Sequence, residues 1–263
     1  PSDRNRLRPG ARSRLLKHKY NLIGASGPAG LARQELEASY TITMQRSVII
    51  VDDVLDNADE VRAAALNLDY ARRDGAPYPG RNSRQRVRIE GLAEACSALT
   101  GERLVPATDS HGLFRVTLEG DEAAQGYAGV HVDDCHWSGI LYLSRPQDCR
   151  GGTDFFRHIP TGMDHAPYRA EHLERAGVSS YEEFVKAVSR PHATDFSKWS
   201  REMRAPMKYN RLVLFRPWLW HTATPGFGTD LQSGRLIHTL FFRSEGPLAS
   251  RTAPGPAPLE FTL

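Results

Sequence analysis

From residue 111 onward, the chain is divided into short β-type runs, each bounded by Gly, Pro or Asp clusters. The runs are Leu113–Leu118, Ala128–Asp133, Ser138–Leu143, Thr153–Phe156, Arg211–Phe215 and Leu236–Phe242. Strands of this length and spacing are typical of an antiparallel barrel or sandwich. The pattern therefore predicts a mainly β fold of the α+β class, with helices packed outside the sheets.

Earlier segments supply the rest of the predicted domain, which we place at residues 41–246. The apolar run Ser47–Val51 predicts its first strand, and Ala58–Leu68 and Leu92–Leu99 have the apolar spacing of helices. Further helical patterns indicate a helical insertion at about 163–205. A chain of 263 residues with 40% hydrophobic and 25% charged residues is long enough to bury such a core.

The two ends of the sequence differ in composition from this domain. Residues 1–20 contain five Arg and two Lys against one Asp, which gives them a charge of +6. The net charge of the whole chain is +3, so the remaining residues sum to −3. We expect a basic, flexible arm at 1–40 and a Pro-rich tail at 247–263. The domain has no basic stripe interleaved with aromatic residues, so we do not expect nucleic-acid binding.

Other features of the composition concern location and cross-linking. No apolar run approaches the roughly 20 residues that cross a bilayer, so we expect no membrane association. The first residues lack the apolar stretch of a secretory signal, which favours a cytoplasmic protein. Three cysteines without zinc spacing argue against a disulfide framework or a structural zinc site. Nothing in the sequence specifies an oligomeric state.

Two His-x-Asp/Glu triplets occur among the ten histidines, and local structure separates them. His172 and Glu174 lie in a helical pattern, where residues two apart point about 200° away from each other. His131 and Asp133 lie in a β-type run, where residues two apart project from the same face. Of the two pairs, His131 and Asp133 are therefore the one that can share a metal ion.

A competing pair, Asp134 and His136, falls on the opposite face of the same run. We prefer His131 and Asp133, because the residues after Asp134 are expected to begin a turn. The best third ligand is His221, which follows a predicted strand and a rigid Pro/Trp segment. Two imidazoles and one carboxylate form the facial triad of non-haem Fe(II) oxygenases, which leaves coordination positions open.

Arg235 stands fourteen residues after His221 and opens the last predicted strand. The order His-x-Asp, distant His, then Arg on a late strand resembles the Fe(II)/2-oxoglutarate-dependent oxygenase superfamily. Segments that resemble its prolyl-hydroxylase-like branch are Val48–Leu55, Tyr142–Ser144 and Gly151–Phe155. Segments that look most like a little-characterised bacterial subfamily of that branch are Thr153–Gly162 and Tyr209–Phe215. The resemblance covers about residues 45–243.

The resemblance implies a fold, a cofactor and a cosubstrate. The fold would be a double-stranded β-helix, a jelly roll similar to that of cupins, with iron at its mouth. His131, Asp133 and His221 would hold Fe(II) and form the catalytic site. Arg235 would bind the distal carboxylate of 2-oxoglutarate, and O₂ would be the second cosubstrate. The activity would be oxidation of an unactivated C–H bond, with release of succinate and CO₂.

Two positions depart from the pattern of the family. Many relatives have Ser or Thr two residues after the Arg, where this chain has Ile237. The prolyl hydroxylases often supply a Tyr hydroxyl to 2-oxoglutarate from the strand that contains the Tyr-Leu pair. A literal alignment predicts that Leu141 faces inward and Tyr142 outward, which would remove that second contact.

We expect a small substrate that resembles an amino acid or an intermediate of specialised metabolism. Hydroxylation, desaturation and ring closure are all open. A Pro/Gly loop at Gly75–Arg81 precedes a predicted strand at Gln85–Ile89, and such a loop can close over a barrel mouth. Arg81 or Arg84 would then hold a carboxylate of the substrate, although these arginines can equally be a solvated face.

Two further classes of function remain alternatives. The same core could modify protein side chains or nucleic acid, the latter with help from the basic arm. A cupin-like metal-binding domain without turnover is the other alternative. Arg235 argues against it, because a plain metal-binding barrel does not need a buried cation beside the metal.

Overall fold

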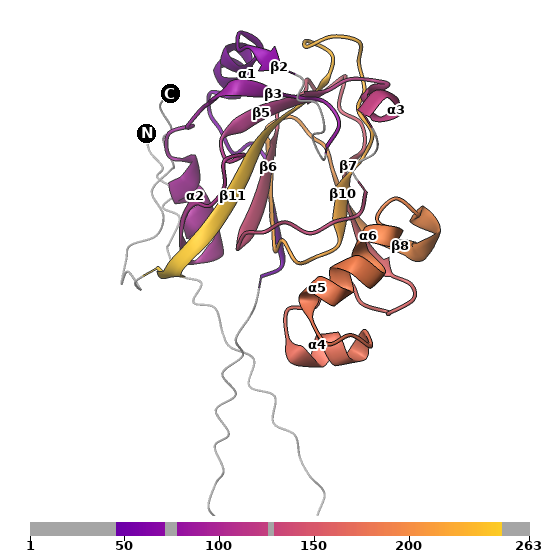
Figure 1. Cartoon of the computed structure of the whole chain (residues 1–263). Coiled ribbons are helices and arrows are strands. Elements are labelled where there is room, and N and C mark those ends of the chain that lie inside the picture. The colour runs from indigo at the N-terminus through magenta and orange to yellow at the C-terminus, as the bar shows by residue number, and fades with distance from the viewer. Residues whose placement is uncertain (1–45, 72–77, 126–128, 249–263) are drawn as a thin grey trace, which may run out of the picture. The chain divides into compact units, whose positions relative to one another are not determined.

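The computed structural model describes residues 46–71, 78–125 and 129–248 (Figure 1). The chain divides into two units after residue 43, and the described residues all belong to the second unit. The predicted arm at 1–40 and all but the first two residues of the predicted tail at 247–263 lie outside the described residues. The following description concerns the second unit alone.

Eight antiparallel strands form the larger of two sheets. They are β1 (Val48–Val51), β2 (Tyr70–Ala71), β3 (Arg81–Arg86), β4 (Glu102–Pro106), β5 (Leu113–Thr117), β6 (Trp137–Tyr142), β9 (Arg211–Phe215) and β11 (Arg235–Pro247). The spatial order is β1-β9-β6-β11-β5-β3-β2, and β4 pairs with the far half of β11. The long strand β11 thus lies near the centre of the sheet and pairs with β4, β5 and β6.

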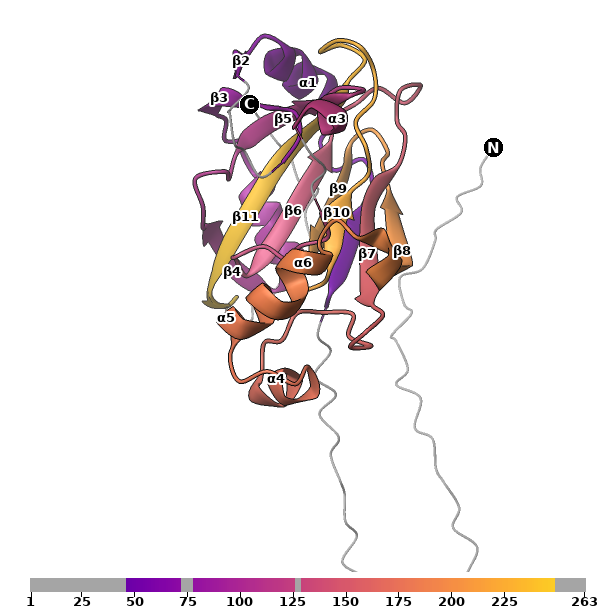
Figure 2. The same ribbon diagram turned by 45° about the vertical axis from the view of Figure 1, so that its right-hand side comes forward.

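The smaller sheet contains β7 (Gly152–His158), β8 (Trp199–Pro206) and β10 (His221–Ala223) in the order β10-β7-β8. An isolated β-bridge between His131 and His221 extends this sheet by one more segment. The two residues exchange both backbone hydrogen bonds, each with an N–O distance of 3.0 Å. Figure 2 shows β7, β8 and β10 as a group beside the strands of the larger sheet.

The helices lie on two sides of this pair of sheets (Figures 1 and 2). Near the larger sheet are α1 (Ala58–Leu66), α2 (Leu92–Thr100) and α3 (Asp121–Gln125). Near the smaller sheet are α4 (Ala170–Arg175), α5 (Tyr181–Phe184), a π-helical turn (Val185–Ser189), α6 (Arg190–His192) and a 3₁₀ turn (Phe196–Lys198). No helix in the described part of the chain is long and apolar enough to cross a membrane.

The two faces of the larger sheet have different neighbours. On the outer face, Leu141 and Leu212 are fully buried and pack with Val61 of α1 and Leu92 of α2 in one apolar cluster. The inner face contributes Tyr142, Val213, Phe215 and Ile237 to a second cluster with Phe155 of β7 and Ala205 of β8. A third cluster joins the smaller sheet to the helical region around Phe184. The core therefore has three layers, and the second cluster is the layer that lies between the two sheets.

The structure confirms a mainly β fold of antiparallel strands with a few helices. It differs in detail around two expected site segments. Residues 129–133 form the single bridge at His131 instead of a regular strand, and residue 128 lies outside the described residues. The predicted loop at 75–81 is described from Tyr78 onward, and β3 already begins at Arg81. Arg81 and Arg84 are therefore strand residues.

Candidate metal centre

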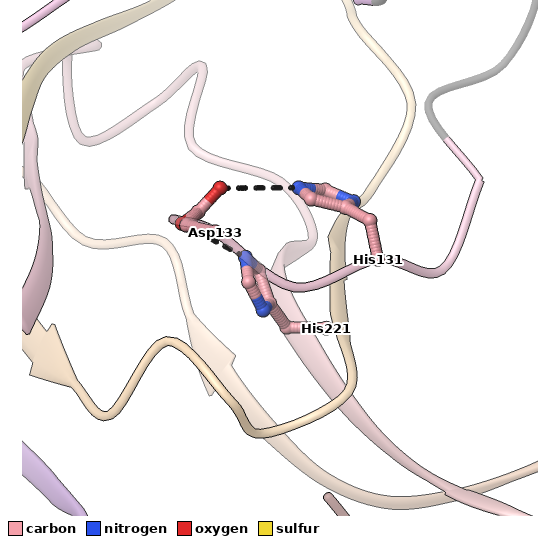
Figure 3. Close-up of side chains that lie close together, drawn as sticks. All are labelled: His131, Asp133 and His221. Carbon is pink, nitrogen blue, oxygen red and sulfur yellow. Dashed lines mark ion pairs between the residues drawn. The ribbon is translucent and has the colours of Figure 1, made fainter. Parts of the chain in front are cut away.

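Figure 3 shows His131, Asp133 and His221 with their side chains pointing toward one another. The three ligand atoms that they offer lie within 4.8 Å of one another. The Asp133 carboxylate is 3.8 Å from Nε2 of His131 and 3.3 Å from Nε2 of His221. The β-bridge between the two histidines explains this convergence, because it places segments ninety residues apart side by side.

Backbone carbonyls orient both imidazoles. The Nδ1 atom of His131 donates a hydrogen bond to the carbonyl of Gly129, and Nδ1 of His221 donates to that of Leu219, both at 2.8 Å. A carbonyl oxygen only accepts hydrogen bonds, so Nδ1 is the protonated nitrogen in each neutral ring. Each Nε2 therefore presents its lone pair toward Asp133, which is the tautomer that binds a metal ion.

The protonation states also suit a metal site. Desolvation, together with the nearby ring of His221, lowers the pKa of His131 to about 4, so this imidazole is neutral near pH 7. Burial by itself raises the pKa of Asp133, but the two imidazoles and the Ser138 hydroxyl outweigh it and hold that pKa well below its usual range. Ser138 Oγ donates to Asp133 Oδ2 at 2.5 Å. A carboxylate and neutral imidazoles are the forms that coordinate a divalent ion.

A cavity of about 720 Å³ opens from these three side chains into the space between the sheets. Arg235, the first residue of β11, lines the same cavity and is 2% exposed. Its Nε and Nη2 atoms have no hydrogen-bond partner, and no carboxylate among the described residues lies within ion-pair distance of it. Burial lowers the pKa of Arg235, but a guanidinium remains charged at neutral pH.

Unsatisfied donors on a buried cation are rare, because they cost free energy unless a partner binds. A carboxylate satisfies such a guanidinium through two parallel hydrogen bonds. The donor set of the triad fits a divalent metal with open positions, and Arg235 fits an organic acid in the same cavity. The predicted residues His131, Asp133, His221 and Arg235 thus converge on one space.

Tyr142 faces this space, so the expectation that it points outward is wrong. In the ladder between β6 and β11, Tyr142 is directly opposite Ile237, which lines the cavity. Residues opposite each other in an antiparallel ladder share a face. The Tyr142 hydroxyl lies 2.7 Å from Thr153 Oγ1, and the Tyr142 ring centroid lies 6.0 Å from Cζ of Arg235. Leu141 is fully buried on the outer face.

The two arginines expected to bind substrate do not line the cavity. Arg81 lies 3.7 Å from the Asp121 carboxylate, and Arg84 is exposed on β3. Arg115 of β5 lines the cavity instead, and the sequence analysis did not select it. One signal was available in the sequence, because Arg115 is a charged residue between apolar neighbours in the run Leu113–Leu118.

Comparison with protein families matches residues 33–242 to the family of unknown function DUF6445. The match covers 210 of 263 residues, so the chain belongs to this family. No curated protein matches the chain. The matched range includes all three residues of the candidate metal centre and Arg235.

Proposed function

We propose that this member of the DUF6445 family is an Fe(II)- and 2-oxoglutarate-dependent oxygenase that acts on a small molecule. One observation carries the proposal. An imidazole–carboxylate–imidazole group with both Nε2 atoms free shares a cavity with the buried, unpaired guanidinium of Arg235. The first group fits a divalent metal and the second fits a carboxylate, and 2-oxoglutarate requires both at once.

The order of the strands supports a double-stranded β-helix as the fold of the core. Eight segments follow one another from β5 to β11, with the His131 segment counted as the second. Of these, β5, β6, β9 and β11 lie in the larger sheet, and the His131 segment, β7, β8 and β10 lie in the smaller sheet. A chain that alternates between two antiparallel sheets in this way describes a jelly roll. The metal ligands then come from two adjacent segments of the smaller sheet.

When bound, Fe(II) and 2-oxoglutarate would supply the oxidising power for an unactivated C–H bond, with succinate and CO₂ as products. His131, Asp133 and His221 would occupy one face of the metal and leave positions for the cosubstrates. Ser138 fixes the Asp133 carboxylate through its hydrogen bond, and the two carbonyls fix the imidazoles. Geometry of this kind is set before any ligand arrives.

Arg235 would bind the distal carboxylate of 2-oxoglutarate deep between the sheets. Ile237, next on the same face of β11, and the ring of Tyr142 supply apolar surface around the guanidinium. Exclusion of water strengthens the ion pair that the carboxylate would form there. The Tyr142 hydroxyl, already paired with Thr153, lies on the face that could give 2-oxoglutarate a second contact.

The cavity favours a small molecule over a macromolecule as the substrate. Its volume of about 720 Å³ falls within the roughly 300–1,000 Å³ that is usual for small-molecule sites. The alternative of a metal-binding domain without turnover leaves Arg235 unexplained. A buried guanidinium with unmet donors is costly unless it has a ligand to bind.

The test is to load the full chain anaerobically with Fe(II) and 2-oxoglutarate, record the visible absorption of the chelate, and then admit O₂. We expect the chelate band followed by succinate and CO₂. In His221→Ala, we expect no iron binding and no succinate. Arg84→Gln, a change on exposed β3, is the control that should behave as the natural protein. Iron binding without any response to 2-oxoglutarate would overturn the proposal.

A further inference from the structure

Two further arginines line the cavity, and the proposed reaction uses neither. Arg204 is paired with Asp154, whereas Arg115 has no carboxylate partner among the described residues. Arg115 lies on β5, next to β11, and the ladder pairs Arg115 with Ile237 and Thr117 with Arg235. Arg115 and Arg235 are therefore diagonal neighbours on one face of the sheet, and both line the cavity. Among the described residues, no carboxylate forms an ion pair with either arginine.

Two side chains hold Arg115 in place. Its Nε donates to Asn82 Oδ1 at 2.7 Å, and its Cζ lies 3.5 Å from the centroid of the Tyr78 ring. Asn82 Nδ2 in turn donates to the Tyr78 hydroxyl at 2.7 Å. This closed set of contacts uses one edge and one face of the guanidinium. A flexible surface arginine would not need such support, whereas a preformed binding group does.

The charged groups around Arg115 favour the binding of an anion. Burial, with a smaller contribution from repulsion by Arg235, lowers its pKa to about 10. Asp133 is close enough to raise the pKa of Arg115, but its carboxylate is already occupied by the Ser138 hydroxyl and the two imidazoles.

Of the other carboxylates that line the cavity, Asp154 is paired with Arg204, and Asp134 is exposed. Glu122 raises the pKa of Arg235 but lies beyond ion-pair distance, and it accepts a hydrogen bond from the backbone N–H of Gly226. Binding of 2-oxoglutarate would neutralise Arg235 and leave Arg115 without an anionic partner.

We propose that Arg115 binds the carboxylate of the molecule that is oxidised, so that the substrate is a small organic acid. This inference rests on the proposed function. Arg115 lines the same cavity as His131 and Asp133, so its guanidinium and the candidate metal centre border one space. A carboxylate held there brings the first few carbons of the acid toward the metal. Arg115 thus takes the role that the sequence analysis gave to Arg81 or Arg84.

The first test separates Arg115 from the 2-oxoglutarate site. The affinity for 2-oxoglutarate is measured on the anaerobic Fe(II) protein, from the visible band, for Arg115→Gln and Arg235→Gln. We expect Arg235→Gln to weaken binding about a hundred- to several-thousand-fold, since it removes one partner of a buried charge pair. Arg115→Gln should change it by less than about threefold. Comparable losses in both variants would mean that both arginines serve 2-oxoglutarate, which overturns the inference. Failure of the natural protein to bind 2-oxoglutarate would instead overturn the proposed function.

The second test uses acetate as the probe for the Arg115 site. The protein is loaded with Mn(II) and saturating 2-oxoglutarate, and the relaxation of the acetate methyl protons by the paramagnetic ion is followed by NMR. We expect saturable relaxation enhancement that disappears in Arg115→Gln and persists in the matched control Arg84→Gln. Enhancement that persists in Arg115→Gln would show that acetate binds the metal directly, and no enhancement in the natural protein would show no site. Either result overturns the inference.

A phosphate competition identifies the class of anion. Inorganic phosphate is added to the same sample at constant ionic strength. A small organic acid site should keep acetate bound at phosphate concentrations equal to that of acetate. Displacement of acetate by phosphate at lower concentrations would mean that Arg115 selects a phosphorylated molecule, and the assignment to an organic acid would be wrong.

Discussion

The two faces of strand β11 differ in what they bury: apolar side chains on the outer face and a charged side chain on the inner face. Outward, Leu236, Leu240 and Phe242 are buried in the apolar cluster under α1 and α2. Inward, Arg235 is just as buried, yet its Nε and Nη2 atoms have no partner. The outer face is packed mainly with apolar side chains, whereas the inner face presents a buried cation with unmet donors to the cavity. Alternation along one strand thus places residues that stabilise the fold and residues that we propose bind a ligand on opposite faces.

The buried polar residue on the outer face, His238, is packed and partly hydrogen-bonded within the chain. His238 is 1% exposed, and its Nε2 donates to the carbonyl of Val87 at 3.0 Å. Its ring packs against Phe114 with the centroids 4.6 Å apart. The chain itself thus supplies a partner for Nε2 of His238 but not for Nδ1, while Arg235, three residues earlier, has none on two of its nitrogens. If stability and binding divide between the two faces, substitutions on the outer face should change stability and those on the inner face should change binding.

The largest effect is expected from Arg235→Gln, which should strongly weaken 2-oxoglutarate binding and spare stability. Loss of the guanidinium should weaken 2-oxoglutarate binding by about 3–5 kcal/mol. The free energy of unfolding should stay the same or rise, because a buried charge without a partner is removed. Titration of the Fe(II) protein with 2-oxoglutarate and urea unfolding of the apoprotein measure the two quantities. A variant that is strongly destabilised would show that Arg235 is a structural residue.

The adjacent residues Leu141 and Ile140 of β6 provide a matched pair across the sheet. Leu141 is fully buried on the outer face, and Ile140 lines the cavity. Leu141→Ala should lower the free energy of unfolding by about 2–5 kcal/mol without changing 2-oxoglutarate affinity in the folded protein. Ile140→Ala should lower stability by only about 1 kcal/mol, since it already borders empty space. Equal losses of stability from the two substitutions would contradict the division between the faces.

The outer face should also determine part of the dependence of stability on pH. Burial lowers the pKa of His238 from 6.5 to about 4. The unfolded chain therefore binds this proton near pH 6.5, and the folded protein does not until about pH 4. Stability contributed by the neutral ring is complete above pH 6.5 and is lost as the pH falls toward 4. Between pH 7 and 5 the loss should be about 2 kcal/mol.

Urea unfolding at pH 7 and pH 5 measures this loss, and His238→Gln is the comparison. The variant should be less stable at pH 7 and should show a smaller decrease between the two pH values. His158, whose pKa burial also lowers to about 4, shifts stability in the same direction in both proteins. An identical decrease in both proteins would exclude His238 as the source.

Much of the site could be predicted from the sequence because period-two geometry is local. His131 and Asp133 share a face wherever the backbone is extended over these three residues, so their pairing could be predicted without knowing the rest of the fold. The structure supplies that backbone through one β-bridge, although a regular strand was predicted. His221 and Arg235 followed from their order along the chain, which the pairing of the His131 segment with β10 explains.

The remaining features depend on long-range pairing that no local pattern reveals. The side to which Tyr142 points is set by its pairing with Ile237, 95 residues later, and a shift of one residue reverses the face. Arg115 enters the cavity because β5 pairs with β11. Arg81 and Arg84 were selected from loop composition, but β3 begins at Arg81 and carries both into the sheet. β8, from Trp199 to Pro206, lay in a predicted helical insertion.

The smallest expected effect is on the inner face, at Ser138. Its hydroxyl donates to Asp133 Oδ2 at 2.5 Å and so fixes a carboxylate of the candidate metal centre without being one of its three members. Ser138→Ala should lower metal affinity about 10-fold, at the low end of the 10- to 100-fold range for such supporting residues. Ser200→Ala, on the exposed face of β8, is the control and should leave affinity unchanged. Competition between a chelator and the protein for Mn(II) measures the metal affinity of both variants. Because Ser138 is buried, the free energy of unfolding is measured in parallel, and a large loss of stability with unchanged metal affinity would place Ser138 among the residues that serve the fold.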